Sequence, residues 1–144
     1  MSFVLDPSVV IKWYVPEVLM EAAARLREEI EERSRPVAVP RFFFVESANV
    51  LWKKSSLIKE LSRSDAKGIY SRILDSPFHI VEDEALLLKA LDLSLDHSVS
   101  VYDGLYLACA LQCKAVLVTA DAVLVKRFTH SGLSKHIVFL KEFE

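Results

Sequence analysis

The 144-residue chain has little of what flexible, secreted or membrane-spanning proteins need. Three glycines and five prolines are too few for a linker or a low-complexity region. No apolar run approaches the roughly 20 residues that cross a bilayer. Because the N-terminus has no basic stretch before an apolar one, we expect no secretion signal and a cytoplasmic protein that does not enter a membrane.

Cysteine is also scarce. The two cysteines, Cys109 and Cys113, lie one helical turn apart in an apolar segment. A structural zinc ion normally needs four ligands, and no histidine lies near this pair in the sequence. We therefore predict that both thiols pack inside a helix and carry no chemistry.

Apolar runs that alternate with helical patterns fill the rest of the chain. The runs predict strands at 3–5, 37–39, 78–81, 115–119 and 137–140. Helical spacing predicts helices from Pro16 to about residue 30 and at 42–54, 62–73, 83–97, 103–113 and 121–128. The leucine-rich helix 83–97 is expected to be buried. Strands separated by helices form a parallel sheet covered on both faces, so we predict one α/β domain over residues 1–144.

Four acids stand where such a sheet gathers its ligands, outside the carboxyl ends of the strands. Asp6 directly follows the first predicted strand, and Asp121 follows the strand at 115–119. Asp103 begins a predicted helix, and Glu46 lies about one turn into another. We predict that these four acids, the acidic quartet, converge in space.

Taken singly, each acid also has a structural interpretation. Asp103 and Asp121 could be helix N-caps, and Asp6 could close a turn. Glu46 shares a helix face with large apolar residues, where a carboxylate is costly to desolvate, and Lys53 could be its ion-pair partner. The pattern of all four acids is more specific than any one of them.

The segments around these acids resemble the motifs of the PIN-domain family in order and spacing. They are Val-Leu-Asp-Pro-Ser-Val-Val-Ile-Lys-Trp at 4–13, Val-Glu-Ser-Ala-Asn-Val-Leu-Trp at 45–52, Ser-Val-Tyr-Asp-Gly-Leu-Tyr-Leu-Ala at 100–108 and Leu-Val-Thr-Ala-Asp at 117–121. The resemblance spans residue 4 to about residue 124. Within the family, the sequence is most similar to the VapC-like toxins of toxin–antitoxin pairs.

The resemblance implies a PIN-like three-layer α/β/α fold with a central, mostly parallel sheet of about five strands. It implies a metal-dependent endoribonuclease whose acidic quartet is both catalytic and metal-binding, with Mg²⁺ or Mn²⁺ as cofactor. It also implies an RNA substrate, a homodimer and a cognate VapB-like antitoxin. Three small polar residues match positions near the quartet and are possible supporting residues: Ser8, Asn49 and Thr119. Two residues depart from the family pattern, since Pro7 and Gly104 replace the small residue and the alanine that are usual there.

Elementary chemistry agrees with this implication. Four crowded carboxylates repel one another, which raises some of their pKa values, and a divalent cation removes that repulsion. Mg²⁺ and Mn²⁺ prefer carboxylate and water ligands, and two such ions can clamp the attacking and leaving oxygens of a phosphodiester. The four histidines, His79, His97, His130 and His136, form no motif. We therefore predict hydrolysis by water, without attack by the 2′-hydroxyl of the RNA.

The net charge of −2 gives no overall basic excess. With the acidic quartet neutralised by metal, 18 Lys and Arg face 16 acids, a balance of +2 that permits a local phosphate-binding surface. The basic residues near the motifs are Lys12, Arg41, Lys53, Lys54, Lys126 and Arg127. Lys12 and Lys53 are our best candidates for RNA phosphate contacts, because they share elements with Asp6 and Glu46.

Two other functions were compared with the nuclease. A PIN-fold module that binds RNA or protein without cleavage stays open as the alternative. A phosphoryl-transfer domain fits poorly, because a phosphatase of the haloacid dehalogenase type needs a second aspartate where Ser8 stands. A receiver domain needs a lysine after a late strand, and Thr-Ala-Asp follows Val118 instead.

Overall fold

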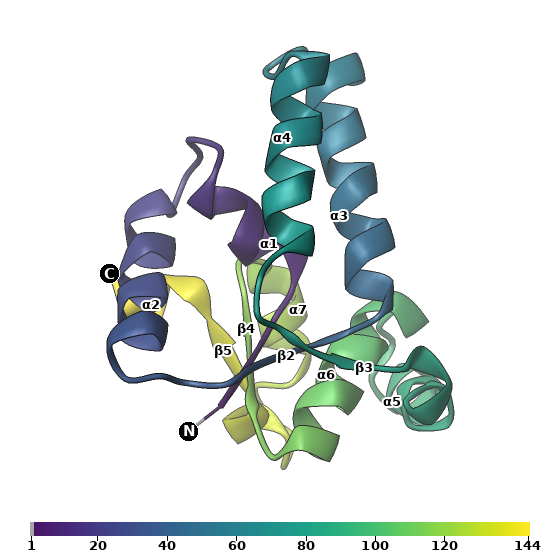
Figure 1. The fold of residues 1–144 in the computed structure, drawn as a ribbon. Helices are drawn as coiled ribbons and strands as arrows, with labels where there is room; N and C mark the ends of the chain where they lie inside the picture. The colour runs from purple at the N-terminus through teal and green to yellow at the C-terminus, as the bar shows by residue number, and fades with distance from the viewer. Residues whose placement is uncertain (1) are drawn as a thin grey trace.

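A five-stranded parallel sheet forms the centre of the molecule in a computed structural model that describes residues 2–144 (Figure 1). Its strands are β1 (Phe3–Leu5), β2 (Val37–Pro40), β3 (His79–Val81), β4 (Val116–Thr119) and β5 (Ile137–Phe139). Their order is β3-β2-β1-β4-β5, and every neighbouring pair is parallel. The predicted α/β fold is confirmed, with a sheet that is wholly parallel.

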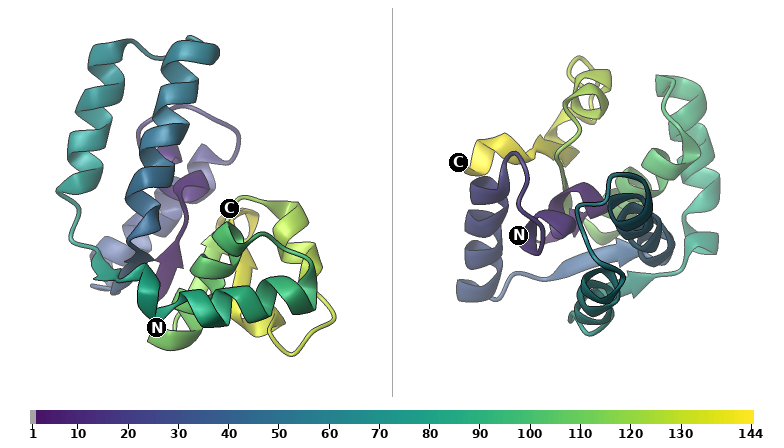
Figure 2. Two further views of the ribbon diagram at one scale, coloured as in Figure 1. Left: turned by 90° about the vertical axis from the view of Figure 1, so that its right-hand side faces the viewer. Right: turned by 90° about the horizontal axis from the view of Figure 1, so that it is seen from above.

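Helices cover both faces of this sheet. The α-helices are α1 (Pro7–Val10), α2 (Met20–Glu32), α3 (Phe42–Trp52), α4 (Arg63–Leu74), α5 (Leu87–His97), α6 (Val101–Cys113) and α7 (Ala122–Arg127). The shorter or wider helical turns are η1 (Ile11–Trp13), η2 (Lys53–Leu57), η3 (Asp83–Ala85), η4 (Ser134–His136) and η5 (Leu140–Phe143). Helix α6 packs against β1, β2 and β4, and α2 lies on the other side of the strands (Figures 1 and 2).

Helices α3 and α4 form a hairpin that extends away from the sheet (Figures 1 and 2). Ser62 is the N-cap of α4, because its hydroxyl accepts a hydrogen bond from the Asp65 amide at 3.0 Å. None of the helices in residues 2–144 combines the length and the apolar character needed to span a bilayer.

The core sits between the sheet and its helices. Strands β1 and β2 are buried along their whole length, as expected for strands covered on both faces. Cys109 is buried within α6, Cys113 is half-buried one turn later, and both thiols are free, which fits the predicted packing role.

The beginning of the chain differs from the prediction. Pro7 does end β1, but it also begins α1, a helix that the sequence analysis omitted. Asp6 is the N-cap of this helix and Pro7 its first residue, a position where a missing N–H costs nothing. The second helix begins at Met20 instead of Pro16, because Leu19 adopts a left-handed conformation with φ of 67°. Residues 16 and 17 therefore lie outside regular structure, and residues 18 and 19 form a turn.

The leucine-rich segment also differs. We expected one buried helix over 83–97, but the segment is a short turn, η3, followed by α5, and only Ala90 and Leu93 of α5 are buried. Leu88 and Leu95 are 76% and 73% exposed. A single face of α5 packs on α6, so its other leucines remain at the surface of this chain.

Candidate active site

All four acids of the quartet line one cavity of about 350 Å³. They reach it from four elements: the end of β1, the middle of α3, the first turn of α6 and the start of α7. Asp6 is buried, Glu46 and Asp103 are half-buried, and Asp121 is exposed. The predicted convergence of these remote residues is therefore present in the structure.

Asp6 is held by the loop that follows β1. Its Oδ1 accepts hydrogen bonds from the backbone amide of Ser8, at 3.0 Å, and from the Ser8 hydroxyl. The same hydroxyl accepts a bond from the Ala120 amide at 3.0 Å, which ties this loop to the end of β4. Pro7 thus leaves Asp6 in a regular capping geometry, and Ser8 contacts both Asp6 and the backbone at the end of β4.

Asp121 serves two purposes. As the N-cap of α7 it accepts hydrogen bonds from the amides of Val123 and Leu124, at 3.0 and 3.1 Å. Both bonds go to Oδ1, so capping leaves Oδ2 to the cavity. The buried Thr119 hydroxyl accepts a bond from the Asp121 amide at 3.1 Å and so orders the turn between β4 and α7.

Asp103 is not a helix N-cap, contrary to one of its two interpretations. Helix α6 begins at Val101, and Ser100 caps it by accepting a hydrogen bond from the Asp103 amide at 3.1 Å. Asp103 is therefore the third helical residue, and its carboxylate is not needed for capping. The sequence shows the signal, a serine three residues before an acid, although only the bond to the serine hydroxyl is present here.

Gly104 follows Asp103 because no side chain fits there. A Cβ at this position would lie 2.7 Å from the Ala90 carbonyl oxygen of α5 and 3.1 Å from the Ser94 hydroxyl. The alanine that is usual in the family would push α5 away from α6.

We expect Gly104→Ala to lower the free energy of unfolding by about 1–3 kcal/mol, the usual cost of overpacking. Gly68→Ala is a matched control, since a Cβ at Gly68 in α4 meets nothing within 4 Å and should stabilise the helix by about 0.5–1 kcal/mol. Urea unfolding curves measure both changes. Equal stability of Gly104→Ala and the wild type would contradict the close approach of α5.

Glu46 is half-buried and lies beside other acids. Within residues 2–144 the Glu46 carboxylate takes part in no ion pair. Lys53, the suggested partner, is exposed and does not line the cavity. The Tyr106 hydroxyl lies close enough to lower the pKa of Glu46, yet this buried group has no partner at hydrogen-bond geometry among the described residues. The structural ion pair with Lys53 is therefore wrong.

Burial and mutual repulsion raise the pKa of three acids. Burial raises the pKa of Asp6 to about 6, although hydrogen bonds from Ser8 and Thr119 oppose the rise. Burial, then the charges of Asp6 and Asp103, raise the pKa of Glu46 to about 7. Burial and the charge of Asp121 raise the pKa of Asp103. Ionising these carboxylates therefore costs free energy through burial and mutual repulsion, and a bound cation would offset that cost.

The donor set fits a hard divalent cation in type, since carboxylate oxygens are what Mg²⁺ and Mn²⁺ prefer. Within residues 2–144, however, no three acidic, histidine or cysteine side chains form a group that could hold an ion as they are placed. Mg²⁺ commonly keeps several water ligands, so the cavity suits a hydrated ion or ligands that move inward on binding.

Two of the other predicted residues, Asn49 and Lys53, are exposed and do not line the cavity.

The cavity also holds basic residues. Lys12, which was predicted, and Lys54 line it together with Glu17, which the sequence analysis did not single out. Glu17 bridges the two lysines, with Lys12 Nζ at 2.9 Å. The cavity is therefore lined by two lysines as well as by the four acids.

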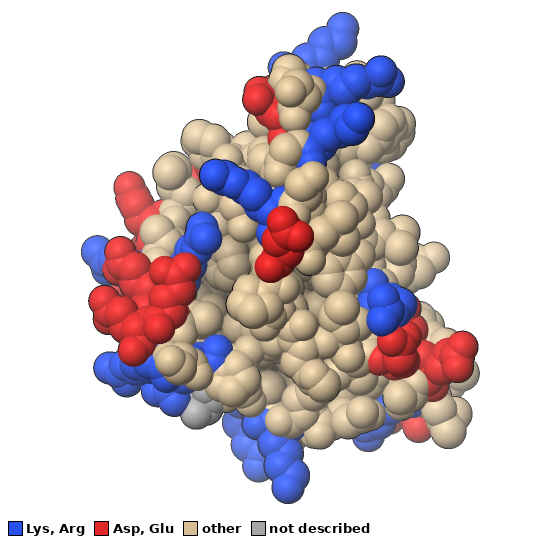
Figure 3. Space-filling view, viewed as in Figure 1, with Lys and Arg blue, Asp and Glu red and all other residues tan. Residues whose placement is uncertain are grey.

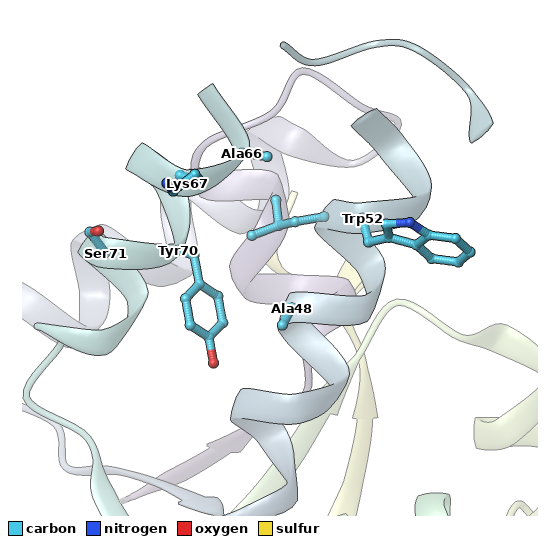
Figure 4. Close-up of a pocket in the computed structure, with 7 residues that line it drawn as sticks. Ala48, Trp52, Ala66, Lys67, Tyr70 and Ser71 are labelled. Atoms are coloured by element: carbon cyan, nitrogen blue, oxygen red, sulfur yellow. The ribbon is translucent and has the colours of Figure 1, made fainter. Parts of the chain in front are cut away.

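An apolar groove of about 340 Å³ lies between α3 and α4, away from the acids (Figure 4). Ala48 and Tyr70 face each other across it, whereas the Trp52 ring points away from α4 (Figure 4). The groove is lined by Ala48, Leu51, Trp52, Ala66, Lys67, Tyr70 and Ser71. Tyr70 closes its lower end by donating a hydrogen bond to the Phe44 carbonyl at 2.9 Å.

A parallel sheet with four acids gathered beyond its strands is the arrangement expected from the motif resemblance. The chain belongs to the PIN-domain family, whose model matches residues 3–128. Ribonuclease VapC3 of Pyrobaculum aerophilum is 33% identical over 133 residues, which cover 89% of this chain and 95% of that protein.

Solved structures show the same fold. PAE2754 of Pyrobaculum aerophilum superposes with a TM-score of 0.72 at 21% identity, over 99% of this chain and 85% of that one. A toxin–antitoxin complex from Klebsiella pneumoniae contains a chain that superposes with a TM-score of 0.63 at 17% identity, over 96% of this chain and 98% of that one.

Proposed function

We propose that the protein is a Mg²⁺- or Mn²⁺-dependent endoribonuclease, the toxin of a VapBC-like pair, acting on RNA in the cytoplasm as one domain of residues 1–144. One observation carries the proposal: carboxylates from four separate elements line a single cavity of about 350 Å³. The similarity to Ribonuclease VapC3 supports the choice of RNA as substrate.

The acidic quartet would hold the ion, and a bound dication would activate water and stabilise the charge that develops on the phosphodiester. The chain itself supplies orientation. Ser8 fixes the Asp6 carboxylate and links it to the end of β4, and Thr119 orders the turn that places Asp121. Asp103 projects from a capped helix, which keeps its position rigid.

Basic side chains offer a path for RNA toward this cavity. Lys and Arg gather over the ends of α3 and α4 that are farthest from the sheet (Figure 3). The exposed basic residues of this hairpin end are Lys53, Lys59, Arg63 and Lys67. Lys53 fits a role as a phosphate contact on this outer surface, outside the cavity that Lys12 lines.

Protein partners are part of the proposal. A VapB-like antitoxin is supported by the similarity to a chain of a toxin–antitoxin complex, and the apolar groove between α3 and α4 suits an amphipathic segment of such a partner. A homodimer is supported by the exposed leucines of α5, which are unusual on the surface of a protein that stays monomeric.

Asp103→Asn tests the function, because the change removes charge and leaves the capping amide in place. We expect the wild type to cleave RNA with Mn²⁺, a chelator to stop it, and the variant to be at least about 100-fold slower, more than the change of an outer-shell partner usually costs. Asp65→Asn is the matched control, since Ser62 and Asp65 repeat the same capping hydrogen bond on the exposed side of α4.

The products decide the route. Fragments that end in a 2′,3′-cyclic phosphate would overturn the hydrolytic mechanism. Wild-type protein that binds RNA and leaves it intact would show a binding module instead of a nuclease. Equal cleavage by Asp103→Asn and the wild type would point to a contaminating enzyme.

A further inference from the structure

Three charged residues meet on one side of the cavity, and we call them the cationic cluster: Lys12, Glu17 and Lys54. They come from η1, from the irregular segment before α2 and from η2. Lys12 Nζ lies 2.9 Å from Glu17 Oε2, and Lys54 Nζ contacts Glu17 Oε1. Each oxygen of the Glu17 carboxylate therefore serves one lysine.

This cluster is unlike a surface ion pair. The side chains of Lys12, Glu17 and Lys54 are 11%, 20% and 12% exposed, whereas exposed pairs contribute little to stability. Burial alone would raise the pKa of Glu17, but hydrogen bonds from Lys54 and Lys12 lower it below its ordinary value. Glu60, which is more exposed, lies 3.5 Å from Lys54 Nζ as a second contact. The three residues of the cluster carry a net charge of +1, since two ammonium groups share the half-buried carboxylate of Glu17, and Glu60 offsets part of that charge from the more exposed side.

Lys12 and Lys54 could pair either with Glu17 or with the carboxylates of the acidic quartet. They line the same cavity as the acidic quartet, so the carboxylates of the quartet are alternative partners to that of Glu17. An ammonium group paired with Asp6 or Glu46 would neutralise the site and compete with a cation for it. In the structure, neither lysine pairs with the quartet.

The local backbone suits this separation. Helix α3 changes to the wider turns of η2 at Lys53, with the Ile58 amide donating to the Lys53 carbonyl at 2.9 Å. Residues 16–19 are an irregular segment that ends in a turn instead of the start of α2, and Glu17 in this segment lines the cavity. Each ammonium group has three N–H donors, so pairing with Glu17 leaves donors for another anion.

We propose that Glu17 is a positioning residue that holds Lys12 and Lys54 off the acidic quartet and presents them to a phosphate of bound RNA. The phosphate half of this inference rests on the proposed function, whereas the separation of the lysines from the quartet does not. The cavity then has an acidic half for the cation and a basic half for the substrate.

Mn²⁺ binding to the full-length protein, measured by calorimetry without RNA, tests the separation. Glu17→Gln frees both lysines, and we expect it to weaken Mn²⁺ binding about tenfold, a small part of the interaction between charges about 4 Å apart. The triple variant Glu17→Gln, Lys12→Gln, Lys54→Gln should bind Mn²⁺ at least as well as the wild type. Rescue by removing the lysines is what a merely structural role of Glu17 does not give.

Glu31→Gln is the matched control, because Glu31 pairs with Arg27 at 3.0 Å on exposed α2. Unchanged Mn²⁺ binding in Glu17→Gln would overturn the proposal. So would a triple variant that binds as poorly as the single one, since the loss would then reflect damage to the fold.

RNA binding tests the second half, with Asp103→Asn as a common background to prevent cleavage. Lys12→Gln and Lys54→Gln should each reduce the steepness of log K against log salt by about 0.7, the value for one phosphate contact on a single strand. The exposed Lys89→Gln on α5 should leave the slope unchanged. Unchanged slopes in both cavity variants overturn the phosphate role, and a wild type that neither binds nor cleaves RNA overturns the proposed function, while the Mn²⁺ result stands on its own.

Discussion

Asp6→Asn is expected to lose RNA cleavage by at least about 100-fold and, at pH 8 without metal, to unfold less readily than the wild type. The two effects have one cause. Asp6 is buried beside other acids, and burial raises the pKa of its carboxyl from 3.8 to about 6, so its ionised form destabilises the metal-free fold. Asparagine removes the charge and keeps an oxygen that can accept the hydrogen bonds of Ser8.

The expected gain in the free energy of unfolding is on the order of 3 kcal/mol, because the pKa of Asp6 rises by roughly two units and each unit corresponds to about 1.4 kcal/mol. The gain should vanish near pH 4, where the wild-type carboxyl is protonated in the folded state. Urea unfolding at pH 4 and pH 8 measures it, and Glu28→Gln on the exposed side of α2 is the control. If Asp6→Asn is less stable than the wild type at pH 8, the ionised Asp6 carboxylate stabilises the fold, and the expected destabilisation by its charge is wrong.

Local patterns were sufficient to predict the sheet. Strands such as Phe3–Leu5 and Val116–Thr119 are apolar runs bounded by polar or turn-forming residues, and their alternation with helices predicts a parallel sheet. The α1 helix was missed because Pro7 suggests a stop, although Asp6 before it is a good N-cap. The exposure of α5 was missed because its leucines give the pattern of a core helix, and the sequence does not say how many neighbours a helix has.

The site was predicted only in part, for a similar reason. The quartet carries a motif around each acid, so its residues could be named from the sequence. Glu17 lies in no recognisable motif. Its contact with Lys54 joins residues far apart in the chain and depends on the conformation of the loop before α2 and on the turns of η2. Lys53 and Lys54 are neighbours, and α-helical spacing from Glu46 points to Lys53. Lys54 lines the cavity instead, because the turns of η2 are wider than those of an α-helix.

The metal-free protein is expected to lose stability as the pH rises from about 4 to about 8. The pKa of Glu46 is raised from 4.5 to about 7, and that of Asp6 from 3.8 to about 6. In this range the folded state keeps protons that the unfolded chain has already released, so unfolding releases protons and becomes easier at higher pH. The stabilising contribution of the protonated acids is complete below about pH 4 and is lost as the pH passes about 7.

Mn²⁺ should reverse this trend, because a cation binds the ionised quartet and the folded state alone. Its stabilising effect should be small at pH 5 and should grow toward pH 8, reaching about 2.7 kcal/mol when its concentration is 100 times the dissociation constant. Thermal unfolding with and without Mn²⁺ across this range measures the effect, and calorimetry in buffers of different ionisation enthalpy counts the protons released on binding. If Mn²⁺ stabilises the protein equally at pH 5 and pH 8, the ion does not compete with protons for the quartet and must bind at another place.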